Sequence, residues 1–153
     1  MVKKVMVAGV FDLIHPGHLY LLWKAKEMGT VVVVVARDST VERVKGRKPI
    51  VPEDQRLEVV SNLKPVDQAV LGHEGDLLRV VEEVKPDVIL LGPNQPFNEE
   101  WLEEELNRRG LNVEVVRLKE AYRGCRFYSS SQIIEEVLAR AERRFNEPTG
   151  SRP

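Results

Sequence analysis

The run TVVVVVA, at residues 30–36, restricts the fold more than any other stretch of this chain. A strand with one wet face alternates apolar and polar residues, whereas this run places valine on both faces. Its β-branched side chains also favour extended over helical backbone. The run therefore predicts a strand of a parallel sheet that is covered on both sides.

The rest of the chain alternates between short apolar runs and amphipathic segments. Further strands are expected at 4–9, 68–72, 87–92 and 112–118, and helices at 16–29, early in 37–51, and at 52–63, 75–86, 98–110 and 129–145. Strands that alternate with helices indicate βαβ units, and right-handed crossovers place the first strand near the middle. We therefore expect an α/β fold, a Rossmann-like doubly wound five-stranded parallel sheet with helices on both faces. One domain is expected at 1–145, followed by a disordered tail at 146–153.

Composition excludes several classes of protein. The 153 residues carry a net charge of −1, so no global basic field indicates nucleic-acid binding. One cysteine, Cys125, excludes an intrachain disulfide and a four-thiolate zinc site, and we interpret it as a partly buried small residue. No apolar stretch approaches the roughly 20 residues that span a bilayer. We expect a cytoplasmic protein with no membrane partner.

Ligands of such folds bind outside the carboxyl ends of the strands. The segments at those ends are 9–18, 37–38, 72–73, 92–95 and 119–126. Neither a P-loop nor a G-x-G-x-x-G fingerprint is present, so a nucleotide site would have to be built in another way.

Two of the three histidines, His15 and His18, lie where the first strand gives way to a helix. Pro16 fits the first helical turn, and side chains three apart lie close together on a helix. The unpaired N–H groups of a helix N-terminus attract anions, Gly17 would let a phosphate approach, and Gly9 permits a tight turn. A purely structural pair and a metal site remain as alternatives, although few other ligands lie nearby.

The stretch GVFDLIHPGH resembles the G-x-F-D-x-x-H-x-G-H signature of the nucleotidylyltransferase superfamily, whose members are cytidylyltransferase-like. The segments VARDSTV, PEDQRLEVV, LKPVDQAVLG, KPDVILLG and GCRFYSSSQII extend the resemblance over Lys3–Ala141. These segments are most similar to the archaeal FAD synthetases, which are FMN adenylyltransferases. One departure is GPNQ, at 92–95, where related sequences carry Gly-Tyr-Asp-Gln.

The resemblance implies transfer of AMP from ATP to FMN, with release of pyrophosphate and with Mg²⁺ accompanying the ATP. It assigns catalytic roles to His15, His18 and Lys45, and homodimers are common among such enzymes. The alternatives are a cytidylyltransferase acting on glycerol 3-phosphate or another phosphorylated alcohol, and a nucleotide-binding module without turnover.

The resemblance also implies two sets of binding residues. The expected nucleotide-binding residues are Gly9, Val10, Phe11, His15, Gly17, His18, Arg56, Gly92, Asn94, Gln95, Tyr128, Ser129 and Ser130. The candidates for phosphate or acceptor contacts are Asp12, Arg37, Asp38, Arg47, Arg123 and Arg126. No dedicated protein ligand for the metal is expected.

Overall fold

The computed structural model describes residues 2–146 and contains every expected strand and helix. The elements are β1 (Lys4–Gly9), α1 (Pro16–Met28), β2 (Thr30–Val35), α2 (Asp38–Lys45), α3 (Glu53–Ser61), β3 (Gln68–Leu71), α4 (Arg79–Val84), β4 (Val88–Leu91), α5 (Glu99–Arg108), β5 (Glu114–Arg117) and α6 (Ser130–Phe145). The helix expected at 75–86 is shorter than predicted, because Asp76 accepts a hydrogen bond from the backbone N–H of Leu78 and forms a turn there.

The five strands form one sheet in the order β3-β2-β1-β4-β5, and every pairing is parallel. The first strand lies in the middle, as predicted. In β2, Val31–Val35 are buried throughout, which confirms that the valine run is covered on both faces. The chain fills one side of β1 before crossing to the other, so the topological switch point lies between β1 and β4.

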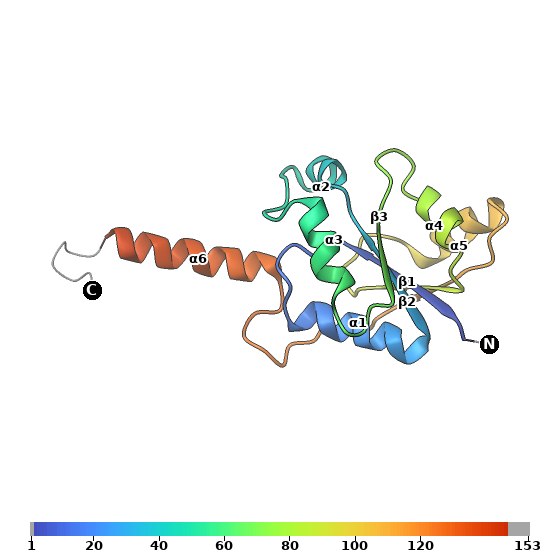
Figure 1. The fold of residues 1–153 in the computed structure, drawn as a ribbon, viewed down its shortest axis with the longest axis horizontal. Coiled ribbons are helices and arrows are strands. Elements are labelled where there is room, and N and C mark those ends of the chain that lie inside the picture. Colours follow the sequence, from blue (N-terminus) through green and yellow to red (C-terminus); the bar gives the residue numbers. More distant parts are fainter. Residues whose placement is uncertain (1, 147–153) are drawn as a thin grey trace.

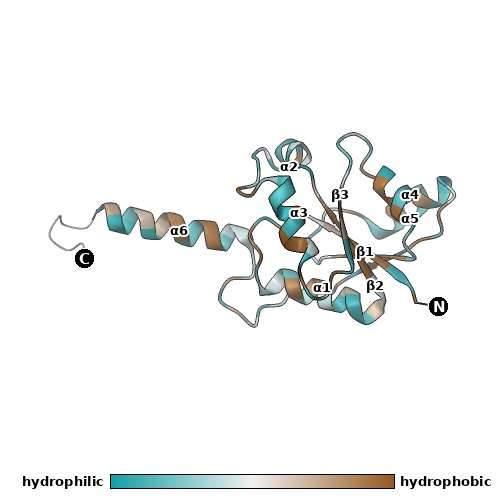
Figure 2. Cartoon of the chain, viewed as in Figure 1, coloured by the Kyte–Doolittle hydropathy of each residue, from teal (hydrophilic) through white to brown (hydrophobic). Residues whose placement is uncertain are grey.

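Two apolar layers cover the two faces of the sheet (Figures 1 and 2). On one face, Leu22 and Ala25 of α1 and Val60 of α3 pack against the odd-numbered valines of β1 and β2. On the other face, helices α4 and α5 pack against Met6, Val34 and β4. The doubly wound α/β architecture predicted from the sequence is confirmed.

Helix α6 projects away from the rest of the chain (Figure 1), and none of its residues is buried. Ser129 caps its first turn by accepting from the backbone N–H of Gln132 (3.2 Å). Cys125, in the preceding loop, is half-buried as expected, and its thiol donates to the carbonyl of Phe127 (3.2 Å). Apart from Asn146, the predicted tail lies outside the described residues. In residues 2–146, no helix is long and apolar enough to cross a membrane.

The turn between α1 and β2 depends on Gly29. A Cβ at this position would lie 2.0 Å from the carbonyl oxygen of Lys3, which accepts the N–H of Thr30 (2.8 Å) beside the first rung of the β1–β2 pairing. No side chain fits at this point unless the two strands move apart.

Gly29→Ala should therefore lower the free energy of unfolding by about 3 kcal/mol, as overpacking a rigid backbone contact does. Urea denaturation followed by circular dichroism measures the change. Gly75→Ala is the control, because a Cβ there meets no atom within 4 Å, and it should stay within about 0.5 kcal/mol of the parent. Equal effects of the two substitutions would contradict this explanation.

Candidate active site

The two histidines of the β1–α1 junction cap the N-terminus of α1. The Nδ1 atom of His15 accepts the backbone N–H of Gly17 (3.1 Å), and Nδ1 of His18 accepts the backbone N–H of His15 (3.3 Å). An accepting ring nitrogen carries no proton, so in both neutral rings the proton lies on Nε2. Within the described chain, neither Nε2 has a hydrogen-bond partner. Each ring therefore has one N–H group free to donate.

Burial and mutual contact keep these histidines neutral. Their rings stack with centroids 3.7 Å apart, and the Phe11 ring lies 5.1 Å from that of His18. Burial, together with charge repulsion from His15 and Lys45, lowers the pKa of His18 from 6.5 to about 3. Burial also lowers the pKa of His15. At neutral pH the pair can therefore offer an anion two neutral hydrogen-bond donors rather than two cations.

The two glycines of the signature make room for side chains. A Cβ at Gly17 would lie 2.9 Å from the His15 ring, and a Cβ at Gly9 would lie 2.9 Å from the ring of Phe11. Phe11 is buried and has a φ of 53°, a left-handed conformation that is costly for a non-glycine residue. We expected glycine at position 17 because it would let a phosphate approach the backbone. The structure adds a second reason, since the imidazole of His15 occupies the space that a Cβ would need.

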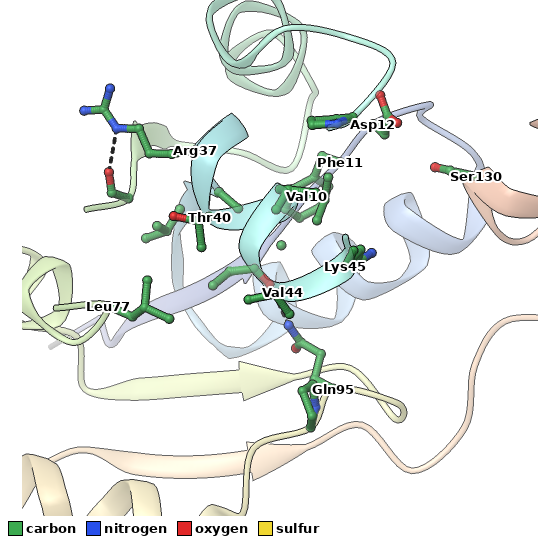
Figure 3. A pocket seen from close by; sticks show the side chains of 18 of the residues that line it. Val10, Phe11, Asp12, Arg37, Thr40, Val44, Lys45, Leu77, Gln95 and Ser130 are labelled. Atoms are coloured by element: carbon green, nitrogen blue, oxygen red, sulfur yellow. Dashed lines mark hydrogen bonds between the residues drawn. The ribbon is translucent and has the colours of Figure 1, made fainter. Parts of the chain in front are cut away.

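A cavity of about 610 Å³ opens at the carboxyl ends of the strands (Figure 3). This is within the usual size range of small-molecule sites. The predicted site residues that line it are Gly9, Val10, Phe11, Asp12, His15, His18, Arg37, Lys45, Arg47, Asn94, Gln95, Tyr128, Ser129 and Ser130. Segments far apart in the sequence thus meet at one edge of the sheet.

Asp12 attaches the basic loop, residues 46–51, to the β1–α1 junction. Its carboxylate accepts the backbone N–H groups of Ile50 (2.9 Å) and Val51 (2.8 Å). Both oxygens are therefore already in use, and the arrangement favours the loop-orienting role of Asp12 over direct metal binding.

Arg56 is buried and holds three segments together. It donates to the carbonyls of Val51 (2.8 Å) and Val10 (2.7 Å) and to the carboxylate of Asp38 (2.7 Å). Its side chain is 0% exposed and does not line the cavity. The expected triphosphate contact of Arg56 stays a prediction, and in this structure Arg56 and Asp38 hold together the loops that surround the site.

The segment after β4 is held from two sides. The Gln95 side chain accepts from the N–H of Gly92 (2.8 Å) and donates to the carbonyl of Ala8 (2.9 Å), which ties β4 to β1. Arg117 donates to the carbonyls of Gly92 (3.1 Å), Gln95 (2.9 Å) and Phe97. Gly92 supplies backbone groups to this arrangement and lies outside the lining. The Gln95 amide thus organises the loop, and Asn94 is the exposed polar side chain there.

The serine run connects the start of α6 to the histidine loop. Ser130 Oγ accepts the N–H of Leu13 (3.1 Å) and donates to its carbonyl (3.0 Å). The two flanking arginines do not line the cavity. Arg123 lies over the Tyr128 ring (5.7 Å), and exposed Arg126 pairs with Glu136 (3.6 Å). A phosphate contact by either arginine stays a prediction.

Three residues that the sequence analysis missed also shape the site. Thr40 and Leu77 line the cavity, and Arg117 fixes the loop after β4. Thr40 lies in the first turn of a helix that follows a buried strand, which was a usable signal. Arg117 follows two valines at the end of β5 and could have been noticed as a charge at the carboxyl end of a strand. Leu77 gave no signal, since its position depends on where α4 begins.

The low pKa values of the histidine pair determine how stability should depend on pH. Between pH 6.5 and about 3, the His18 side chain binds a proton in the unfolded chain but not in the folded protein. Stability should therefore fall as pH is lowered below about 6.5, and these rings should add no dependence above it. Urea denaturation at a series of pH values measures this. The fall should be shallower in His18→Gln, and long-range ¹H–¹⁵N NMR at pH 7 should show protons on Nε2. Charged imidazoles at pH 7 would refute the assignment.

Replacing Arg56 distinguishes a positioning role from direct phosphate binding. Arg56→Met leaves Asp38 and two carbonyls without their donor, so the free energy of unfolding should fall by roughly 3 kcal/mol. Arg79→Met is the control, because Arg79 is exposed and its ion pair with Glu83 is long (3.9 Å). If Arg56→Met were as stable as the parent yet bound ATP poorly, Arg56 would be a direct ligand.

Close relatives of this chain are known. A protein named FAD synthase from Ferroglobus placidus is 49% identical over 146 residues, 95% of this chain and 94% of the relative. A second FAD synthase, from Methanothermus fervidus, is 52% identical over 136 residues, 86% of this chain and 92% of the relative. A crystal structure described as a lipopolysaccharide core biosynthesis protein from Thermoplasma volcanium is 48% identical, with a TM-score of 0.76 over 80% of this chain and 99% of that one.

A family model described as cytidylyltransferase-like matches residues 6–136. That range holds the histidine pair, the basic loop and the serine run. These are the segments that the structure brings together at the carboxyl edge of the sheet. The chain therefore belongs to the cytidylyltransferase-like family.

Proposed function

We propose that this chain is an FAD synthase, an adenylyltransferase that transfers AMP from ATP to the phosphate of FMN. The proposal rests on two neutral histidines at a helix N-terminus that line the cavity and whose Nε2–H groups are free to donate. Donors arranged in this way stabilise negative charge on phosphate oxygens. The two relatives named FAD synthase, at 49% and 52% identity over most of the chain, support FMN as the acceptor.

The reaction needs charge stabilisation rather than a base. An oxygen of the FMN phosphate attacks the α-phosphorus of ATP, and the bond from that phosphorus to the bridging oxygen breaks. Pyrophosphate leaves with the electron pair. The attacking phosphate is already ionised, so no proton has to be removed. His15 and His18 donate to oxygens that gain charge, and their low pKa values keep both donors neutral throughout the neutral pH range.

Lys45 supplies the positive charge of the site. It ends α2, lines the cavity, and lies close enough to His18 to lower its pKa. Gly46 follows with a φ of 77°, and the exposed loop 46–48 carries Arg47 and Lys48. Because Asp12 anchors this loop at Ile50 and Val51, these cations stay near the histidines while their side chains remain free to follow a phosphate.

A divalent cation such as Mg²⁺ fits this site as part of the substrate. In residues 2–146, no group of three or more His, Cys, Asp or Glu side chains is placed to hold a metal ion. Triphosphate oxygens and water would therefore provide most of its ligands, as is usual for Mg²⁺ with nucleotides. A homodimer and a cytoplasmic location also stay proposals, and sedimentation of the purified protein measures the first.

A two-nucleotide screen tests the activity. Pyrophosphate release is measured with ATP or CTP, each combined with FMN, glycerol 3-phosphate or a sugar phosphate, in the presence of Mg²⁺. We expect release only with ATP plus FMN, accompanied by formation of FAD. Turnover with CTP and another acceptor would contradict the proposed reaction and identify the chain as a cytidylyltransferase. Tight nucleotide binding without pyrophosphate from any pair would indicate a binding module.

His18→Ala should lower kcat by about 100-fold or more, because it removes a donor to the transition state. Its cost in stability should be about 1 kcal/mol, the price of one lost capping interaction. Lys45→Ala should also lower kcat without unfolding the protein, and Lys24→Ala, on the exposed surface of α1, is its control. An unchanged kcat in His18→Ala would exclude the assigned role.

A further inference from the structure

The cavity continues past the histidines into the layer between the sheet and helices α4 and α5. Its inner wall includes Met6, Val34, Val81, Ile89 and Leu91, which also belong to the apolar core on that face. The phosphate-binding groups lie elsewhere. Figure 3 shows Thr40 and Leu77 at one end of the pocket and Ser130 at the other. The cavity therefore has a polar end and an apolar end.

Arg37 also lies at this end, but its guanidinium already donates to the carbonyl of Gly72 (2.9 Å) and to Glu53 (2.9 Å), so the polar side chain that stands out there is Thr40. It lies in the first turn of α2 and lines the cavity. Its Oγ1 is buried, and among the side chains of residues 2–146 it is the single buried nitrogen or oxygen atom without a hydrogen-bond partner. Leaving a buried hydroxyl unpaired costs stability, and a partner from a bound ligand would recover that cost.

Two apolar side chains flank this hydroxyl. Val44 lies one helical turn after Thr40 and is 64% exposed although it borders the cavity, and Leu77 faces it from the segment before α4. An apolar wall with one isolated hydroxyl fits a flat ring that is mostly hydrocarbon on one edge and polar on the other. Adenine fits less well, because nitrogen atoms surround most of its perimeter and would be buried without partners.

We propose that the apolar end of the cavity binds the isoalloxazine ring of FMN, and that Thr40 Oγ1 hydrogen-bonds to a heteroatom on the polar edge of that ring. The proposal rests on the proposed function, which makes FMN the acceptor. The dimethylbenzene edge lies against the apolar wall, and the ribityl phosphate extends toward Lys45 and the histidines. Thr40 thereby becomes a specificity-determining residue for the acceptor.

Thr40→Val tests this placement, because valine keeps the shape of threonine and lacks the hydroxyl. Binding of riboflavin, which carries the ring without the phosphate, is measured by quenching of flavin fluorescence. We expect its Kd to rise about 10-fold, while the Kd for ATP with Mg²⁺ stays unchanged. Thr40→Ser keeps the hydroxyl and should retain most of the flavin affinity.

A second measurement separates this role from a merely structural one. If Thr40 Oγ1 is unpaired in the ligand-free protein, Thr40→Val should raise the Tm of that protein by roughly 2–4 °C. Affinity and stability should thus change in opposite directions. A lower Tm would show that the hydroxyl already has a partner, and would contradict the proposal.

The outcomes also distinguish this proposal from the proposed function. If the parent releases pyrophosphate with ATP and FMN, and Thr40→Val has an unchanged KM for FMN, the ring lies elsewhere and the function stands. If Thr40→Val instead raises the Kd for ATP and leaves the Kd for riboflavin unchanged, the apolar end binds adenine. If the parent shows no turnover with ATP and FMN, the proposed function is itself contradicted.

Discussion

Two backbone N–H groups at the start of α1 determine the electrostatics of the whole site. Because they donate to Nδ1 of His15 and His18, each ring must carry its proton on Nε2. Burial then holds both rings neutral. The same two hydrogen bonds therefore cap the helix and leave the opposite ring edges free to donate. A structural role and an anion-binding role do not exclude each other. In each ring, Nδ1 caps the helix and Nε2–H is left to donate to an anion. Metal binding fits poorly, because the nitrogen left free in each ring is protonated.

Precise placement of these donors depends on side chains that tie the segments around the cavity to one another. Arg56 joins the β1 end, the basic loop and the start of α2, and Asp12 joins that loop to the histidine junction. Arg117 and Gln95 do the same for the segment after β4. Segments that only met at a sheet edge would move by more than catalysis tolerates. These polar side chains thus limit the motion of the loops that surround the site.

Most of the fold could be predicted from local patterns, because periodicity and strand alternation determine which face of each element is buried. The valine run and the Ser129 cap are examples. The sequence predicted where the site residues lie, at the carboxyl ends of the strands, but not what each of their side chains does. Arg56 and Gln95 look like ligands in the sequence, and only tertiary contacts reveal that both side chains already donate to backbone carbonyls. Leu77 was missed because nothing local distinguishes a residue that lines a cavity from one that faces water, whereas the position of Thr40 after a buried strand could have indicated its place.

The cavity has a polar end and an apolar end, which separates the residues proposed to act on the triphosphate from those proposed to hold the acceptor. The histidine pair, Lys45 and the serine run line the polar end, so their geometry is tied to the proposed reaction. The apolar end is built from α2, the segment before α4 and the inner face of the sheet. Side chains there can change without moving the capped helix start, because His15 and His18 form that cap themselves and Asp12 attaches the basic loop to the same junction. Acceptor choice can therefore change while the transfer chemistry stays intact.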